Sequence, residues 1–524
     1  MEASRLREAA AAPSAGHEQR LAELERRRER ALLMGGAEKL ERRRREGRLN
    51  ARERIARLVD PGSFAETGMF AASSRPEKRD ASPADGKVSG FAKVDGRPIA
   101  LVSNDFTVLG ASSSPVNNRK MRHVKEVATN RGMPLVLLGE SSGGRMPDLM
   151  GAVNVAPTDN PTQYRRMREI PWVSAVLGPC FGSASWYASL SDYVVMRRGA
   201  TLGVSSPRLT AVATGEEVDV QELGGWRVHA RESGLVDEVA EDDEEALELV
   251  RRFLSYLPSH HAERPPRAPV PAGSDDACRG ILDHLPESRT RVYDVRRIVD
   301  AIVDTGSRFE LKAHFGRAIV TALARIDGET VGIVASNPSV KGGAIDPDAC
   351  DKATSFLVLC DSFNVPLVFL VDQPGFLIGA RGEARGATGK VMNWMNALSL
   401  CTVPKLSVIL RKSYGQALLN MGIGGNSDQV AIWPSGEVSF MEPEYGARVV
   451  HGKRIDAGEM TLEEAVAEMR QATGPYELAS NYTAHAVIDP RDTRAYLKAT
   501  LEYHSSRRTD GIGEHLMRAW PTTI

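Results

Sequence analysis

The chain contains two copies of one sequence pattern. The segment 91–104, FAKVDGRPIALVSN, returns as LARIDGETVGIVAS over 323–336. Three more pairs follow in the same order: 133–138 with 365–370, 170–174 with 403–407, and 181–184 with 414–417. Asp95 recurs as Asp327 after 232 residues, and Gly182 recurs as Gly415 after 233. A repeat of nearly constant spacing indicates an internal duplication, so we predict two tandem domains of one fold.

Length and charge agree with a large globular protein and exclude some functions. The 524 residues exceed what one hydrophobic core usually organises. A formal net charge of −1 gives no reason to expect nucleic acid, whose binders carry a basic excess. No apolar run reaches the roughly 18 to 20 residues of a membrane helix. The charged N-terminal residues contain no signal-peptide core, so we expect a cytoplasmic protein.

The cysteines predict neither a disulfide framework nor a metal site. They are scattered and contain no C-x-x-C pair, and they lie at Cys180, Cys278, Cys350, Cys360 and Cys401. The dipeptide His260-His261 lies in a proline-rich stretch, where solvated histidines are more common than metal ligands. We therefore expect no metal in this chain.

Composition divides the chain into four segments. Residues 1–50 form a charged, helical N-terminal arm, in which charged helix is expected from residue 17 and is broken near Gly35-Gly36 and Gly47. Residues 258–273 hold five prolines and are expected to form an extended linker. The two domains are then 51–257 and 274–524. Residues 71–86 are predicted to form a surface loop.

Within each copy, predicted strands alternate with helical stretches, which indicates an α/β architecture with buried parallel strands. These strands end in glycine-rich turns at 139–144, 178–184, 372–375 and 414–417. Glycine lets the backbone approach a ligand closely, and the first N–H groups of a following helix point outward as donors. Such donors stabilise an oxyanion without an ionisable side chain. Matched turns in both copies therefore indicate two oxyanion-binding sites.

Two other motifs allow different interpretations. The turn 139–143 fits G-x-S-x-G, the nucleophile elbow of α/β-hydrolases, with Ser141 as the nucleophile. The matching turn at 372–375 has no serine, and a hydrolase gives no reason for a duplication. The run 421–425, MGIGG, is too short for a dinucleotide-binding fingerprint.

Several motifs together resemble one family. They are ARERI at 51–55 with LVDPGSF at 58–64, NDFTV at 104–108, GPC at 178–180, TGEEV at 214–218 with ELGG at 222–225, D-x-x-x-K at 348–352, PGF at 374–376 and RKSYG at 411–415. From about residue 40 to 500 the chain resembles the carboxyltransferase (β) subunits of biotin-dependent acyl-CoA carboxylases, such as propionyl-CoA and methylcrotonyl-CoA carboxylases. The resemblance implies two tandem crotonase-like domains of the ClpP/crotonase superfamily. It also implies a homo-oligomer, normally a hexamer, in which each active site lies between the first domain of one chain and the second domain of its neighbour.

The resemblance also implies a reaction and its site residues. CO2 passes from carboxybiotin to the α-carbon of an acyl-CoA through enolates that two sets of backbone donors stabilise. The implied catalytic donors are Gly182 and Ser183 for the acyl-CoA thioester, and Gly415, Gln416 and Ala417 for biotin. Implied substrate-binding residues are Gly143, Gly144, Arg145 and Leu419, of which Leu419 is expected to line an apolar acyl pocket. Implied biotin-binding residues are Pro374, Gly375, Phe376 and Tyr414.

Some turns depart from the family pattern. Family members commonly have glycine at the positions of Ser183 and Gln416, so this chain adds side chains where ligands should approach. The stretches SSGGR at 141–145, MEPEY at 441–445 and SSSPV at 112–116 differ from the usual sequences as well. These departures leave the acyl group undetermined.

The chain lacks a biotin-attachment sequence of the type AMKM and a region for an ATP-using biotin carboxylase. A separate biotin carboxyl carrier and a biotin carboxylase subunit are therefore expected as partners, with biotin carried on the former. Two alternatives stay open. One is a decarboxylase or transcarboxylase subunit of the same fold, and the other is a noncatalytic structural subunit of a carboxylase complex.

Overall fold

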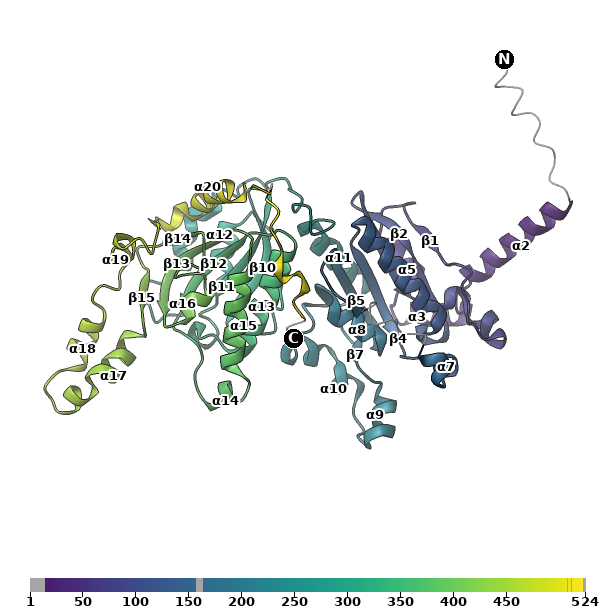
Figure 1. The fold of residues 1–524 in the computed structure, drawn as a ribbon, viewed down its shortest axis with the longest axis horizontal. Helices are drawn as coiled ribbons and strands as arrows, with labels where there is room; N and C mark the ends of the chain where they lie inside the picture. The colour runs from purple at the N-terminus through teal and green to yellow at the C-terminus, as the bar shows by residue number, and fades with distance from the viewer. Residues whose placement is uncertain (1–14, 157–163, 507, 510, 522–524) are drawn as a thin grey trace, which may run out of the picture.

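The protein consists of two α/β halves joined by residues 257–276, which contain no helix or strand (Figure 1). The structure is a computed structural model that describes residues 15–156, 164–506, 508–509 and 511–521. Each half contains one eight-stranded sheet. No helix in the described ranges is long and apolar enough to cross a membrane.

The two sheets have the same topology. The first has the order β1-β2-β3-β4-β5-β6-β8 with β7 on β5, and the second has β9-β10-β11-β12-β13-β14-β16 with β15 on β13. In each sheet the first two pairings are antiparallel and the others are parallel. The first sheet contains β1 (Ala65–Thr67), β2 (Lys87–Val94), β3 (Arg97–Asn104), β4 (Leu135–Ser141), β5 (Trp172–Phe181), β6 (Tyr193–Arg197), β7 (Thr201–Gly203) and β8 (Glu238–Ala240). The second contains β9 (Phe309–Leu311), β10 (Ile319–Ile326), β11 (Glu329–Ser336), β12 (Leu367–Gln373), β13 (Lys405–Tyr414), β14 (Gln429–Ile432), β15 (Glu437–Ser439) and β16 (Ala486–Val487).

Both halves contain helices, many of which lie over the sheets (Figure 1). Those up to the junction are α2 (Ala15–Leu32), α3 (Ala37–Arg45), α4 (Ala51–Leu58), α5 (Pro115–Arg131), α6 (Met146–Leu149), α7 (Ala152–Val155), α8 (Ser183–Leu190), α9 (Pro207–Thr214), α10 (Val220–Gly224) and α11 (Asp243–Tyr256). Those beyond it are α12 (Arg296–Ile302), α13 (Pro347–Ser362), α14 (Ala380–Glu383), α15 (Ala387–Leu400), α16 (Ala417–Asn420), α17 (Pro443–Asp456), α18 (Leu462–Met469), α19 (Pro475–Ser480) and α20 (Thr493–Ser505).

The duplication extends to individual backbone angles. The hairpin turn Asp95-Gly96 has φ values of 51° and 78°, and its counterpart Asp327-Gly328 has 54° and 78°. Positive φ at both central residues matches the right-handed twist of the flanking strands. Irregular pairing recurs as well, between Gly139 and Ser141 in β4 and between Val371 and Gln373 in β12. The predicted duplicated α/β architecture is confirmed.

The two halves share a hydrophobic core at their junction. Tyr193 of β6 stacks on Phe253 of α11 at a centroid distance of 4.5 Å, and its ring lies 5.5 Å from that of Phe309 in β9. Tyr256, also in α11, stacks on Phe309 at 5.8 Å. Because aromatic rings from both halves meet here, burial of apolar surface stabilises their relative position.

The predicted surface loop at 71–86 is only partly exposed. Its second part forms the 3-10 turns η1 (Pro76–Ala81) and η2 (Pro83–Gly86). Asp85 is fully buried and accepts a hydrogen bond from Arg145 at 2.5 Å. Residues 76–81 are exposed as predicted, but the prediction was wrong for the buried residues 84–86. Polar composition does not reveal a distant arginine that compensates a buried carboxylate.

Candidate functional site

The first strand-to-helix turn follows β5. Gly182 has φ 65° and ψ −131°, and α8 begins at the next residue, Ser183. A positive φ of this kind is readily available only to glycine. The N–H groups of Ser183 and Ala184 precede the first helical acceptor, whereas those of Ser185 and Trp186 donate to the carbonyl oxygen of Gly182, at 2.9 and 3.3 Å. The turn therefore presents main-chain donors at the end of the sheet.

A second glycine turn lies against the first one. A Cβ added to Gly182 would lie 3.6 Å from the Cα of Gly143, which follows β4. Gly143 has φ 101°, and its carbonyl oxygen accepts a hydrogen bond from the N–H of Ser113 at 2.8 Å. The Ser113 and Ser183 hydroxyl oxygens are 2.7 Å apart. The side chain that this chain adds at position 183 is thus hydrogen-bonded to Ser113.

The corresponding turn in the second half follows β13. Gly415 has φ 64°, within a degree of Gly182, and α16 begins at Ala417. The N–H of Gly415 donates to the carbonyl oxygen of Ser439 at 3.1 Å. Of the three predicted donors, Gln416 and Ala417 therefore have N–H groups that remain available to a ligand. The side chain of Gln416 is exposed and that of Ala417 is buried.

The predicted biotin-binding residues surround this second turn. Gly375 has φ 125°, and a Cβ added to it would meet only the carbonyl oxygen of Tyr414, at 3.9 Å. Pro374 and Phe376 are half-buried beside it. The Tyr414 hydroxyl donates to Glu437 at 2.6 Å, and burial, with this bond, raises the pKa of Tyr414 well above its usual range. The structure therefore brings Pro374, Gly375, Phe376 and Tyr414 together with the turn at Gly415.

Two predicted substrate-binding residues, Arg145 and Leu419, make hydrogen bonds within the chain. The Arg145 guanidinium is buried and bonds to Asp85 and, at 3.1 Å, to Ser112. These contacts occupy Arg145 within the chain, whereas Gly144 is exposed beside it. Leu419 is half-buried in α16, and its carbonyl oxygen accepts a hydrogen bond from Asn426 at 3.1 Å.

Ser141 does not have the geometry of an exposed nucleophile. Its side chain is fully buried, and its hydroxyl lies 3.3 Å from the carbonyl oxygen of Ala111 and 3.1 Å from the N–H of Gly143. A nucleophile elbow would instead present the hydroxyl at the surface of the strand-to-helix turn. The hydrolase interpretation is therefore wrong.

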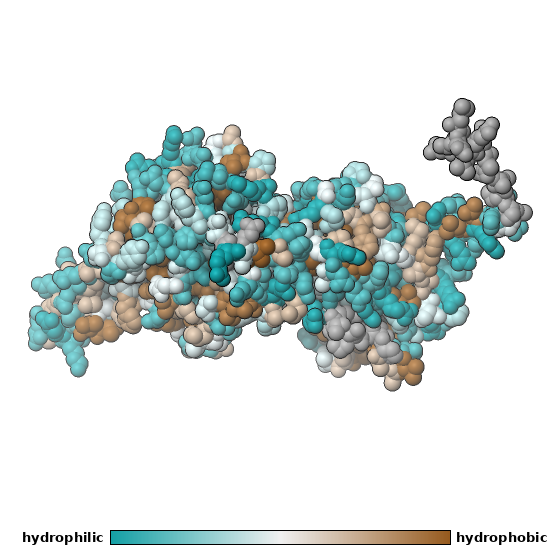
Figure 2. Space-filling view, turned by 45° about the horizontal axis from the view of Figure 1, so that its top comes forward, coloured by the Kyte–Doolittle hydropathy of each residue, from teal (hydrophilic) through white to brown (hydrophobic). Residues whose placement is uncertain are grey.

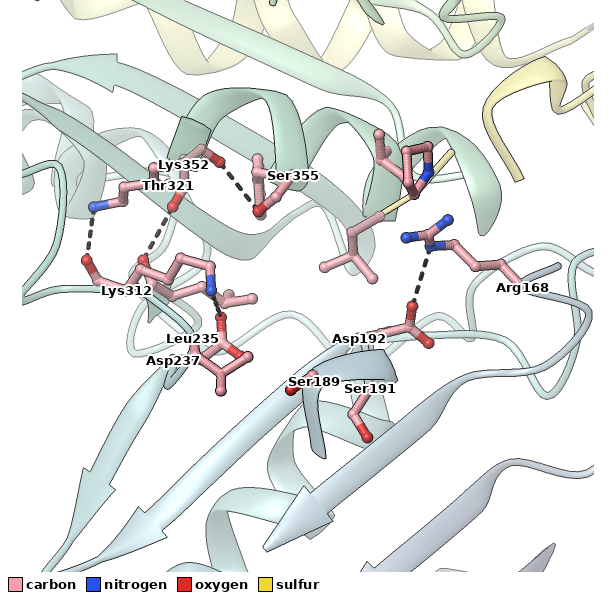
Figure 3. A pocket seen from close by; sticks show the side chains of 15 residues that line it. Arg168, Ser189, Ser191, Asp192, Leu235, Asp237, Lys312, Thr321, Lys352 and Ser355 are labelled. Carbon is pink, nitrogen blue, oxygen red and sulfur yellow. Dashed lines mark hydrogen bonds and ion pairs between the residues drawn. The ribbon is translucent and has the colours of Figure 1, made fainter. Parts of the chain in front are cut away.

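A pocket between the two halves was not predicted (Figure 3). Asp237 from the first half lies 3.3 Å from the Lys312 amine of the second. The buried Lys352 amine donates to the carbonyl oxygens of Lys312 and Phe315, at 2.9 and 3.1 Å. Burial lowers the pKa of Lys352 to about 7. Lys352 belongs to the D-x-x-x-K motif at 348–352, but this motif did not point to a pocket, because the pocket walls come from distant segments that meet only in the folded chain.

Comparisons with known proteins identify the family. Residues 42–515 match the model of the carboxyl transferase domain. This chain belongs to the carboxyl transferase domain family. The match includes both strand-to-helix turns, so the resemblance in the sequence motifs is confirmed over residues 42–515.

Two curated carboxyltransferases and one crystal structure show how close the similarity is. The methylmalonyl-CoA carboxyltransferase 12S subunit of Propionibacterium freudenreichii subsp. shermanii is 35% identical over 488 residues, which cover 90% of this chain and 92% of that protein. The propionyl-CoA carboxylase carboxyltransferase subunit of Haloferax mediterranei is 32% identical, with coverage of 94% and 97%. A crystal structure of the transcarboxylase 12S hexamer assembly, with methylmalonyl-coenzyme A and methylmalonic acid bound, superposes with a TM-score of 0.86 at 34% identity. The match covers 95% of this chain and 97% of that one. This carboxyltransferase thus belongs among those of biotin-dependent acyl-CoA carboxylases and transcarboxylases.

Proposed function

We propose that this carboxyltransferase moves CO2 from carboxybiotin on a separate carrier to the α-carbon of an acyl-CoA. The observation that carries the proposal is the pair of strand-to-helix turns at Gly182 and Gly415, with φ values of 65° and 64°. Both partial reactions place negative charge on an oxygen, and each turn offers main-chain donors for one such oxygen.

The first turn is proposed to bind the thioester. The N–H groups of Gly182 and Ser183 donate to the carbonyl oxygen, and these bonds strengthen as removal of the α-proton places charge on it. Gly143 keeps the approach to this oxygen open, because it has no side chain beside Gly182. We propose that Leu419 contributes an apolar wall to the acyl site.

The second turn is proposed to hold the biotin ring. Carboxybiotin supplies the CO2 and, after releasing it, a base for the α-proton. The residues fit such a planar ring, because neither Gly375 nor Gly415 has a side chain, and Pro374 and Phe376 flank the site. The N–H groups of Gln416 and Ala417 donate to the ring carbonyl oxygen.

Assembly is proposed to complete the site. Exposed apolar side chains gather on α17 at the far end of the second half, where Tyr445, Val449 and Val450 are 69%, 72% and 61% exposed (Figure 2). Exposed apolar clusters mark protein interfaces. We propose a homohexamer with a biotin carboxylase and a biotin carboxyl carrier as further partners. The cytoplasmic location predicted from the sequence stays a prediction.

The test is reconstitution. The full chain is combined with a biotin carboxylase, biotinylated carrier, ATP and labelled bicarbonate, and a panel of acyl-CoA esters is offered. Label in an acid-stable acyl-CoA product supports the proposal. No label in any ester, together with carboxylation of the carrier, would leave the noncatalytic subunit as the better interpretation.

A second candidate is a transcarboxylase subunit, which the 12S relative favours by its identity of 35%. Transfer to a non-CoA acceptor distinguishes the two functions. The carrier is first carboxylated from labelled methylmalonyl-CoA in the absence of ATP. It would then transfer the label to a keto acid only when the partner subunits of a transcarboxylase are present.

A further inference from the structure

The first half has a cavity directly behind its strand-to-helix turn. Ala184, next to Ser183 in α8, lines it together with Lys87, Asn104 and Cys180. The cavity volume is about 20 Å³, which is enough for one or two water-sized groups. It therefore accommodates a small group rather than a long chain.

The duplication provides an internal control for this cavity. Gly139 and Ala188 line it in the first half, and the equivalent positions of the second half carry Val371 and Met421, which are both buried. The larger side chains fill the space that glycine and alanine leave. The cavity thus exists because the first copy has small residues where the second has large ones.

Lys87 is the second difference between the copies. It begins β2 and is 4% exposed, whereas Ile319 begins β10 at the equivalent position and is fully buried. The fold accommodates an apolar residue at this position, so it does not require an amine there. Burial without a partner is unfavourable for a charged amine, and a compensating role is therefore expected.

Among the described residues, the Lys87 amine makes no hydrogen bond and has no carboxylate oxygen within 4.0 Å. The acid whose charge acts on this amine is Asp85 of η2, which bonds to Arg145 and to Ser114. Burial lowers the pKa of Lys87 to about 8, so the amine is mostly charged at pH 7. Burial also raises the pKa of the neighbouring Cys180 thiol to about 12, so Cys180 supplies no negative charge.

We propose that Lys87 and this cavity bind a carboxylate carried by the acyl group of the CoA ester. A buried ammonium group pairs best with a small anion whose oxygens accept its hydrogen bonds. The inference rests on the proposed function, because the turn at Gly182 would place the acyl group at the mouth of the cavity. Two sources share this chemistry: the carboxylate on the α-carbon after transfer, and a carboxylate at the far end of a dicarboxylic acyl chain.

Equilibrium binding to the full chain in its native assembly tests the inference without any turnover. Isothermal titration calorimetry compares malonyl-CoA with acetyl-CoA for the α-carboxylate, and glutaryl-CoA with butyryl-CoA for the distal one. In one of the two pairs, we expect the ester that carries the carboxylate to bind more tightly than its uncharged counterpart. We expect Lys87→Ile, which copies the second half, to reduce that preference by about tenfold or more without weakening the uncharged ester.

Two variants serve as checks. Lys93→Ile removes an exposed lysine from the same strand and should leave the preference unchanged. Ala188→Met fills the cavity as Met421 does in the second half, retains the amine, and should abolish the preference as well. Equal binding within both ester pairs by the native chain, or a preference that survives both Lys87→Ile and Ala188→Met, would overturn the inference and leave Lys87 as a counter-charge for Asp85. Failure of every CoA ester to bind would instead contradict the proposed function.

Discussion

At the scale of single residues, variants at position 183 distinguish the role of the backbone N–H from that of the serine hydroxyl. Ser183 is the first residue of α8, a position where proline is well tolerated because its missing N–H has no helical acceptor. The preceding Gly182 is outside the helical region at ψ −131°, so a proline after it causes no clash. Ser183→Pro therefore removes one donor and leaves the helix intact.

We expect Ser183→Pro to lower kcat roughly a hundred- to a thousandfold, the usual cost of one oxyanion donor. Ser183→Ala keeps the N–H and loses only the contact with Ser113, so its kcat should stay within about tenfold of the parent. Steady-state carboxylation assays on both variants provide the measurement. Equal losses in the two variants would show that the hydroxyl, rather than the N–H, is the important group.

Lys352 predicts a pH dependence of stability. Its pKa is about 7 in the folded chain because burial disfavours the charged amine, and its ordinary value is 10.5. Between these values the unfolded chain binds more protons than the folded one, so stability rises with pH across this window. The charged groups that act on this amine are Glu310, Arg296, Lys312 and Asp237.

Lys352→Met should remove part of this slope, up to roughly 1 kcal/mol per pH unit. Urea denaturation at pH 7, 8 and 9 gives the slope, and Lys93→Met serves as an exposed control. The variant also deprives the carbonyl groups of Lys312 and Phe315 of a donor, but this cost does not depend on pH. A slope that matches that of the parent would contradict a lowered pKa.

At the scale of elements, equivalent buried carboxylates in the two copies pair with arginines from different helices or strands. Glu140 and Asp372 occupy equivalent strand positions and are both fully buried. Asp372 bonds to Arg411 of β13 at 3.0 Å. Glu140 bonds to Arg54 of α4 at 2.7 Å and to Arg43 of α3 at 2.9 Å. The position equivalent to Arg411 is Gly178, where an added Cβ would lie 2.2 Å from a Glu140 carboxylate oxygen.

Arg54→Leu should therefore destabilise the first half by about 3 kcal/mol, the lower end of the usual cost of breaking a buried ion pair, because Arg43 still pairs with Glu140. Arg54 also bonds to the buried Asp243 at 2.9 Å, so two carboxylates lose a partner. The midpoint of urea denaturation measures the effect. Arg57→Leu, on the exposed side of the same helix, should change stability by less than about 0.5 kcal/mol; a comparable loss there would mean that charge removal from α4 alone accounts for the effect.

These elements also show how far sequence reasoning extends. The strands and the turns at Gly182 and Gly415 could be predicted because their signals are local and each copy supports the other. The partners of Glu140 and Asp85 could not, because an arginine 86 or 60 residues away leaves no local signal. The cavity at Lys87 was missed for the same reason, since its size depends on Gly139 and Ala188, which look unremarkable in isolation.

At the scale of the whole molecule, the two turns lie in separate halves of the chain (Figure 1). The halves are joined by a shared aromatic core, so their relative position is not expected to change during a reaction cycle. The predicted hexamer gives each first-half turn a second-half turn from a neighbouring chain. This arrangement makes a prediction about mixtures of variants.

Ser183→Pro disables the first turn, and Gly415→Val disables the second because valine disfavours a φ of 64°. Each variant alone should retain at most about a hundredth of the parent activity. When the two are co-expressed with different tags, random pairing makes half of the pairs mixed, and each mixed pair has one of its two sites intact. Activity should then return to about a quarter of the parent value if neighbouring chains share sites in symmetric pairs. Sites built within single chains would always contain one disabled turn, so mixed oligomers without activity would contradict the shared arrangement.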